Sequence, residues 1–70
     1  MRRLSRPERL DIAREELRSL YRGYEDWIEA LPESQTEGIL ADKLQETIDA
    51  LEEALDHLDG IDPPRGFGRD

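Results

Sequence analysis

The chain lacks the residues on which small proteins rely for covalent or metal support. Its 70 residues include no cysteine and a single histidine, His57. Without cysteine no disulfide can form and no thiolate can bind zinc, and one histidine cannot make a histidine-rich metal site. A domain of this length is near the lower limit for a self-sufficient core, so oligomerisation is the remaining means of support. We therefore expect a homo-oligomer with no metal and no cofactor.

Long apolar runs are also missing. No segment approaches the roughly 20 apolar residues that cross a bilayer. The arginine-bearing start is followed by charged sequence and not by an apolar signal segment. We expect a soluble, cytoplasmic protein that does not bind membranes.

What the chain has instead is a heptad pattern in two halves. Apolar residues recur at alternating steps of three and four in each half, which predicts two amphipathic helices. A short break with proline, serine and glycine lies between them, which is typical of an antiparallel hairpin. The predicted fold class is all-α: a two-helix hairpin that assembles into a homo-oligomeric bundle, with four helices if it is a dimer. The first stripe is Leu10, Ala13, Leu17, Leu20, Tyr24, Trp27 and Leu31, and the second is Leu40, Leu44, Ile48, Leu51, Leu55 and Leu58. The predicted oligomer core is Leu17, Leu20, Tyr24, Trp27, Leu44, Ile48, Leu51 and Leu55.

Capping signals give the helix ends. Ser5 followed three residues later by Glu8 has the spacing of a capping box, and Pro32 disfavours helical geometry just before it. Ser34 and Glu37 repeat the capping-box spacing before the second stripe. The predicted organisation is a hairpin over 1–60, with helices at about 6–31 and 35–59, and a Pro/Gly/Arg tail over 61–70.

Charge is distributed unevenly. Residues 1–22 carry seven arginines and four acids, whereas residues 23–70 carry three cations and fourteen acids. Arginines near the first helix start and aspartates near the second helix end are each unfavourable for their own helix dipole. A hairpin brings the two ends together, so we expect Arg6 and Arg9 to face Asp56 and Asp59. The acidic excess favours a basic protein partner over nucleic acid.

No catalytic constellation is apparent. The inward positions are apolar or aromatic apart from one threonine, and the carboxylates fall on outward faces. Glu53 and His57 lie four residues apart beside the stripe, which is too little for a metal site. The sequence therefore predicts a protein that is not an enzyme.

Carboxylates follow the outer side of the second helix. They are Asp42, Glu46, Asp49, Glu53 and Asp56. One interpretation is a face that is solvated or paired with Arg14, Arg18 and Arg22 of another subunit. The other is a docking stripe for a basic partner, with carboxylates in place of nucleic-acid phosphates.

The tail over 61–70 is the strongest candidate binding site, ahead of these carboxylates, because it belongs to neither heptad stripe. Arg65 and Arg69 could clamp a carboxylate or phosphate, and Phe67 could stack on a base or fill a pocket. The alternative is that the tail folds back on the acidic helices of its own oligomer.

Three segments carry a resemblance: Leu31-Pro32-Glu33, Ala41-Asp42-Lys43-Leu44 and the closing Gly66-Phe67-Gly68-Arg69-Asp70. In these the chain resembles a group of small helical-hairpin proteins of phage and prophage regions. The resemblance implies an accessory protein that acts in the cytoplasm of a bacterial host, and it carries over no functional residue. The architecture is also similar to plasmid Rop-type hairpins, which dimerise into four-helix bundles, a likeness of fold and not of function.

These observations favour a non-enzymatic binding protein that inhibits or modulates a host protein, such as a defence protein. The alternative is an oligomer that sequesters a signalling nucleotide between the Arg/Phe tails and the tyrosine-bearing helix. A second alternative is an RNA- or DNA-binding hairpin, which the net charge disfavours. Its contacts would come from Arg2, Arg3, Arg6, Arg9, Arg14 and Arg18.

Overall fold

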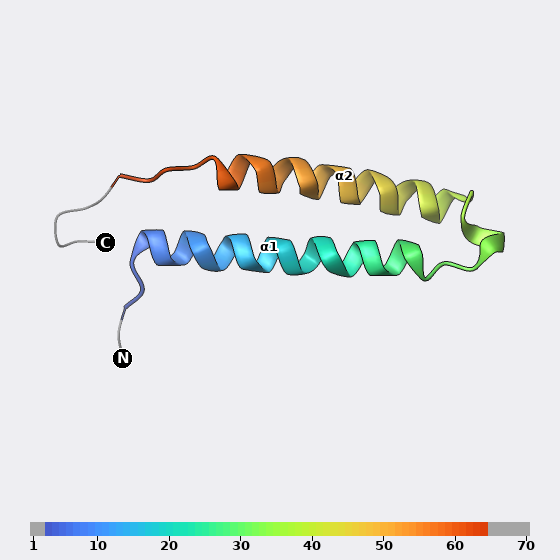
Figure 1. Cartoon of the computed structure of the whole chain (residues 1–70), viewed down its shortest axis with the longest axis horizontal. Helices are drawn as coiled ribbons and strands as arrows, with labels where there is room; N and C mark the ends of the chain where they lie inside the picture. The colour runs from blue at the N-terminus through green and yellow to red at the C-terminus, as the bar shows by residue number, and fades with distance from the viewer. Residues whose placement is uncertain (1–2, 65–70) are drawn as a thin grey trace.

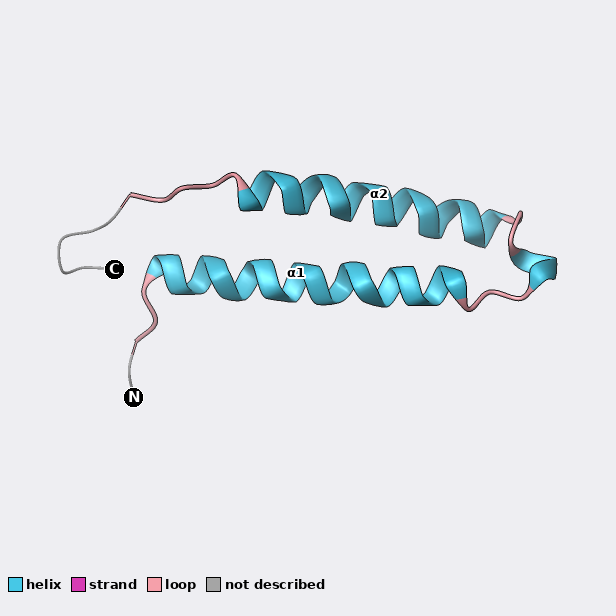
Figure 2. Ribbon diagram, viewed as in Figure 1, coloured by secondary structure: helices cyan, strands magenta, loops and turns pink. Residues whose placement is uncertain are grey.

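The computed structural model describes residues 3–64, and within them all regular secondary structure is helical, with no strand. Helix α1 spans Arg6–Glu29, a short 3-10 helix η1 spans Glu33–Gln35, and helix α2 spans Ile39–Asp59. The two long helices run antiparallel and pack along their length (Figures 1 and 2). The prediction of an all-α hairpin is confirmed at the level of two packed helices.

Helix α1 begins as its sequence predicts. The Ser5 hydroxyl accepts a hydrogen bond from the Glu8 backbone N–H at 3.2 Å, and the Ser5 N–H donates to the Glu8 carboxylate at 3.1 Å. This reciprocal capping box satisfies two backbone donors that the helix leaves free. The helix ends at Glu29, two residues before the predicted end at Leu31.

Helix α2 begins at Ile39, four residues later than predicted. Its N-cap is Gly38, which has no side chain to cap the first turn. The preceding residues form η1 instead, in which the Gln35 N–H donates to the Pro32 carbonyl at 2.8 Å and the Thr36 hydroxyl donates to the Glu33 carbonyl at 2.9 Å. The capping-box spacing at Ser34 and Glu37 therefore marks a turn and not the start of α2.

The hairpin is a single layer. Its extents are 56 × 26 × 13 Å, and the shortest is close to the diameter of one helix with its side chains, about 10–12 Å. The radius of gyration is 16.8 Å, whereas a compact domain of this length has about 11 Å. No described helix is apolar over a stretch long enough to cross a bilayer.

The contact between the helices forms a narrow seam. Its members follow heptad spacing and are buried or half-buried: Leu10, Arg14, Leu17, Tyr21, Tyr24, Ile28 and Leu31, with Ala41, Leu44, Ile48, Leu51, Leu55 and Leu58. Among the described residues only Ala41, Leu44 and Ile48 are buried, with 3–5% of their surface exposed.

The predicted oligomer core divides into three groups. Leu44 and Ile48 are buried within the hairpin. Half-buried in the seam are Leu17, Tyr24, Leu51 and Leu55. Leu20 and Trp27 are left 46% and 49% exposed. The seam of α1 is thus rotated from the predicted stripe, because Arg14, Tyr21 and Ile28 take the inward row in place of Ala13, Leu20 and Trp27.

Candidate interaction surface

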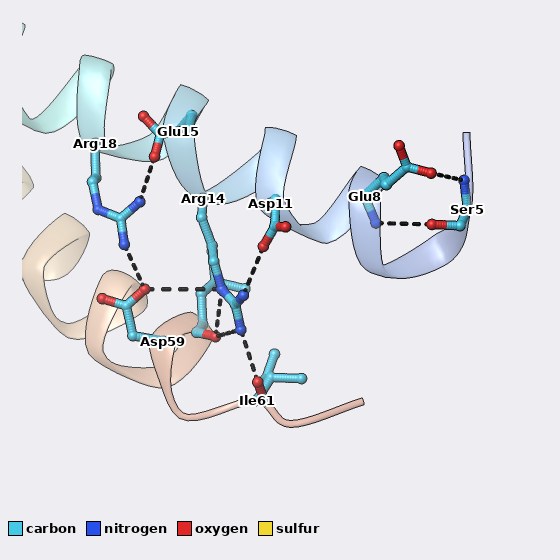
Figure 3. A network of polar contacts seen from close by, with 9 residues as sticks. Ser5, Glu8, Asp11, Arg14, Glu15, Arg18, Asp59 and Ile61 are labelled. Carbon is cyan, nitrogen blue, oxygen red and sulfur yellow. Dashed lines mark hydrogen bonds and ion pairs between the residues drawn. The ribbon is translucent and has the colours of Figure 1, made fainter. Parts of the chain in front are cut away.

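An arginine from α1 closes the C-terminal end of α2 (Figure 3). The Arg14 guanidinium donates to the Leu58 carbonyl from Nε at 3.0 Å and from Nη2 at 2.8 Å, and Nη2 also donates to the Ile61 carbonyl at 2.8 Å. Its Nη1 donates to Asp11 at 3.0 Å, and the side chain is only 17% exposed. A cation is favourable at this helix end, where backbone carbonyls lack partners within the helix.

Asp59 lies beside this arginine and joins a second one. Its Oδ1 accepts from Arg18 Nη2 at 2.8 Å and lies 3.8 Å from Arg14 Nε. Arg18 also contacts Glu15 at 2.9 Å. A carboxylate at a helix C-terminus is unfavourable alone, and the two guanidinium groups offset that repulsion.

The opposite charges do meet across the hairpin, but through different residues than predicted. The cations that contact Asp59 are Arg14 and Arg18, and not the expected Arg6 and Arg9. Both are one to three turns further along α1, because the end of α2 aligns with the interior of α1 and not with its first turn. Two of the three arginines considered as partners for another subunit are therefore engaged inside the chain.

The carboxylates of the second helix form the acidic stripe. All five are exposed: Asp42, Glu46, Asp49, Glu53 and Asp56. Within α2, Lys43 Nζ lies 3.8 Å from Glu46, and the Gln45 amide donates to Asp49 at 2.9 Å. Lys43 is the only lysine on α2, which carries seven carboxylates, so the acidic stripe remains strongly negative.

Carboxylates near the seam also affect the ionisation of Tyr21. Its pKa is raised chiefly because burial in the seam disfavours the charged phenolate, and further because Glu25 and Glu52 lie close by. Glu25 also hydrogen-bonds the phenol, which favours the neutral form. Carboxylates from both helices therefore converge at the middle of the hairpin.

An aromatic pair lies on α1 beside the seam. The rings of Tyr24 and Trp27 are stacked, with centroids 6.1 Å apart and planes 17° apart. Gly23, next to this pair, has no neighbour within 4 Å of the position a Cβ would occupy. No neighbouring helix therefore approaches α1 closely at this glycine within the hairpin.

The tail residues Arg65, Phe67 and Arg69 lie outside the described residues. Within residues 3–64, no group of three or more His, Asp or Glu side chains is placed to hold a metal ion. Arg14 is the main feature that sequence reasoning missed. Its signal was its spacing, since it lies four residues after Leu10 and three before Leu17, on the inward row.

Comparisons with protein-family models, with curated proteins and with solved structures gave no significant match.

Proposed function

We propose that the protein is a non-enzymatic, homo-oligomeric binding protein whose acidic stripe docks on a basic surface of a host protein. In this proposal it is an accessory factor of a phage or mobile element, acts in the bacterial cytoplasm, and inhibits or modulates its target by covering that surface. The observation that carries the proposal is the exposure of all five stripe carboxylates along one helix.

The stripe is unfavourable for the helix that bears it. Like charges four residues apart cost about 0.2–0.5 kcal/mol per pair, and α2 has such pairs at Asp42 and Glu46 and at Asp49 and Glu53. Two of the three arginines considered as their partners are engaged elsewhere, because Arg14 and Arg18 bind the end of α2. A basic partner would relieve this repulsion and gain favourable charge pairing.

The geometry of the stripe indicates the shape of the partner surface. Asp42, Asp49 and Asp56 repeat every seven residues, so their spacing along the helix is about 10.5 Å. A partner should therefore present lysines or arginines in a row of similar spacing. Arginine suits this contact because its guanidinium can bind a carboxylate through two hydrogen bonds.

The test is affinity capture from a bacterial lysate with two charge-matched variants. One neutralises the acidic stripe, by changing Asp42, Asp49 and Asp56 to Asn and Glu46 and Glu53 to Gln. The control neutralises five exposed carboxylates elsewhere: Glu16, Asp26, Glu29, Glu33 and Glu37. Both lose the same net charge, so a partner that depends on the stripe is captured by the wild type and the control but not by the stripe variant.

Equal capture by both variants would contradict docking through the stripe. The alternatives enter as further arms of the same experiment. A nucleotide ligand should raise the melting temperature of the purified protein by mass action. A nucleic-acid partner should survive neutralisation of the stripe and be lost when the arginines of α1 are changed.

A further inference from the structure

The two flat sides of the hairpin differ in chemical character. Residues seven apart point in nearly the same direction from a helix axis, so each side is lined by one row from each helix. On α1, the residues one position after Leu10, Leu17 and Tyr24 form a row on one side of the seam. The residues one position before Arg14, Tyr21 and Ile28 form a row on the other side.

One side is charged. Its α1 row is Asp11, Arg18 and Glu25, and its α2 row is Gln45, Glu52 and Asp59. Arg18 and Asp59 contact each other at 2.8 Å, which establishes that these two rows share a side of the layer. The carboxylates of Glu25 and Glu52, which both raise the pKa of Tyr21, lie on it as well.

The opposite side is apolar, and we name it the apolar face. Its α1 row is Ala13, Leu20 and Trp27, and its α2 row is Leu40, Thr47 and Ala54. Leu20, Trp27 and Leu40 are 41–49% exposed in the hairpin. From Ala13 to Trp27 on α1, and from Leu40 to Ala54 on α2, neither row contains a charged residue; Arg6, in the first turn of α1, continues the α1 row beyond one end of the apolar face.

Two details show that the apolar face is suited to a protein contact that excludes water. Thr47 is its only hydroxyl residue, and that hydroxyl donates to the Lys43 carbonyl at 2.8 Å, so its hydrogen-bonding need is met within α2. Trp27 stacks on Tyr24, which orders a large aromatic surface beside the seam. Contiguous exposed apolar surface of this kind marks an interaction site in soluble proteins.

We propose that the apolar face is covered by the same face of a second copy of this chain, giving a two-layered dimer of four helices. This inference rests on the oligomeric state proposed above and assigns the surface that makes it. Domains are built from two packed layers around a core, and the hairpin supplies one layer, 13 Å thick. A second copy supplies the other through a self-complementary two-fold contact.

The available area matches what a stable dimer needs. The helices α1 and α2 have 24 and 21 residues, so side by side they present a face of about 34 × 20 Å, or about 700 Å². Standard interfaces bury about 800 Å² on each partner. The elongated shape, with a radius of gyration of 16.8 Å, is also that of one layer of a bundle.

The arrangement leaves the acidic stripe accessible. By the same spacing, Asp42, Asp49 and Asp56 flank the charged side, and Glu46 and Glu53 lie at the outer edge of α2. Pairing of the apolar faces therefore displays one stripe from each copy, directed away from the contact. The dimer is bivalent, with one partner site on each copy.

The test compares two substitutions to glutamate on the same helix. Leu20 lies on the apolar face, whereas Ile12 is 54% exposed on the outer edge of α1, in a row with Ser19 and Asp26. Leu20→Glu places a carboxylate in the contact twice and should raise the dimer dissociation constant at least ~100-fold in sedimentation equilibrium. Ile12→Glu makes the same chemical change at a similar exposure and should leave the constant within about threefold of the wild type.

A measurement on the wild type keeps the proposal testable even where Leu20→Glu fails to fold. Trp27 is the only tryptophan, so its fluorescence reports on the apolar face alone. Its emission should shift to the blue and become protected from iodide over the concentration range in which the dimer forms. A monomer throughout the micromolar range, or a dimer in which Trp27 stays as quenchable as in the monomer, would overturn the proposal. The capture experiment with the stripe variant tests only the proposed function. Its result does not bear on the dimer, because the acidic stripe lies outside the apolar face.

Discussion

Removing Arg14 should be the most damaging change at a charged residue of this chain. Its guanidinium binds two backbone carbonyls, those of Leu58 and Ile61, while only 17% exposed. Arg14→Ala leaves both carbonyls without that donor and exposes the seam beneath the lost side chain. Hydrogen bonds with a charged partner contribute about 1.5–3 kcal/mol each when buried. Because this network is at the hairpin end and partly solvated, we expect a loss of about 2–3 kcal/mol in the free energy of unfolding.

The loss should be visible by circular dichroism. For a domain of this size 1 kcal/mol corresponds to about 4–8 °C in melting temperature, so Arg14→Ala should lower it by about 10–20 °C at fixed protein concentration. Arg14→Lys keeps the charge but not the planar fork that reaches both carbonyls, and should recover less than half of the loss. Arg18→Ala removes an exposed ion pair to Asp59 and should cost only about 0.2–1 kcal/mol.

Arg22→Ala is the matched control. Arg22 is exposed on the same helix, lies outside the network at the end of α2, and its removal changes the net charge equally. Repeating the melts in high salt separates the two kinds of contact, since salt screens the Arg18 pair but weakens the Arg14 hydrogen bonds little. If Arg14→Ala and Arg22→Ala shift the melting temperature equally, the Arg14 contacts do not stabilise the hairpin and the reasoning fails.

Three further predictions follow from the seam and its flank. Leu44→Ala should cost about 2–4 kcal/mol in urea unfolding, because Leu44 is 3% exposed, and a loss below 1 kcal/mol would contradict its burial. The pKa of Tyr21 is raised, so the folded chain holds the phenol proton more tightly than the unfolded chain, in which the pKa is 10.0. This contribution to stability is complete below pH 10.0 and is lost as pH rises through the folded pKa. Tyr21→Phe should therefore flatten the alkaline decline in the free energy of unfolding, and an unchanged decline would contradict this role of Tyr21. Gly23→Ala should stabilise α1 by about 0.5–1 kcal/mol, because the added Cβ meets nothing within the hairpin; a loss in thermal melts would instead indicate a close neighbour there.

The start of α1 was predictable because its determinants are local. Ser5 and Glu8 satisfy each other's backbone groups across three residues, and no distant contact is needed. The start of α2 depended on more than spacing. Ser34 and Glu37 have the same spacing, but the chain first turns through η1, and α2 starts at Ile39 only after Gly38. Two identical spacings thus led to different structures because the second one lies in a connection whose geometry the packed helices impose.

The direction in which α1 faces α2 was harder to predict. Leu17 and Tyr24 belong to two overlapping heptad patterns, one completed by Leu20 and Trp27 and the other by Tyr21 and Ile28. The sequence favoured the first, because the second requires Arg14 to point into the seam. That row is allowed only where an acceptor for the guanidinium exists, and the acceptor comes from the far end of the chain, at Leu58 and Ile61. The exposure of the acidic stripe could be predicted from the sequence of α2 alone, because it depends only on helical spacing. The contacts of Asp59 could not, because they come from Arg14 and Arg18 on the other helix.

The burial of Arg14 in the seam and the exposure of Trp27 outside it connect the fold to the proposed dimer. A hairpin whose sequence served only its own stability would place the tryptophan in the seam and the arginine outside it. Arg14 is tolerated inside because its guanidinium donates to carbonyls at the end of α2, and this contact joins the two helices at one end of the hairpin. Trp27 remains 49% exposed on the side opposite the charged rows, whereas Ile28 lies half-buried in the seam. In the proposed dimer a second copy of the hairpin covers Trp27, and the acidic stripe along the outer side of α2 stays accessible to another protein.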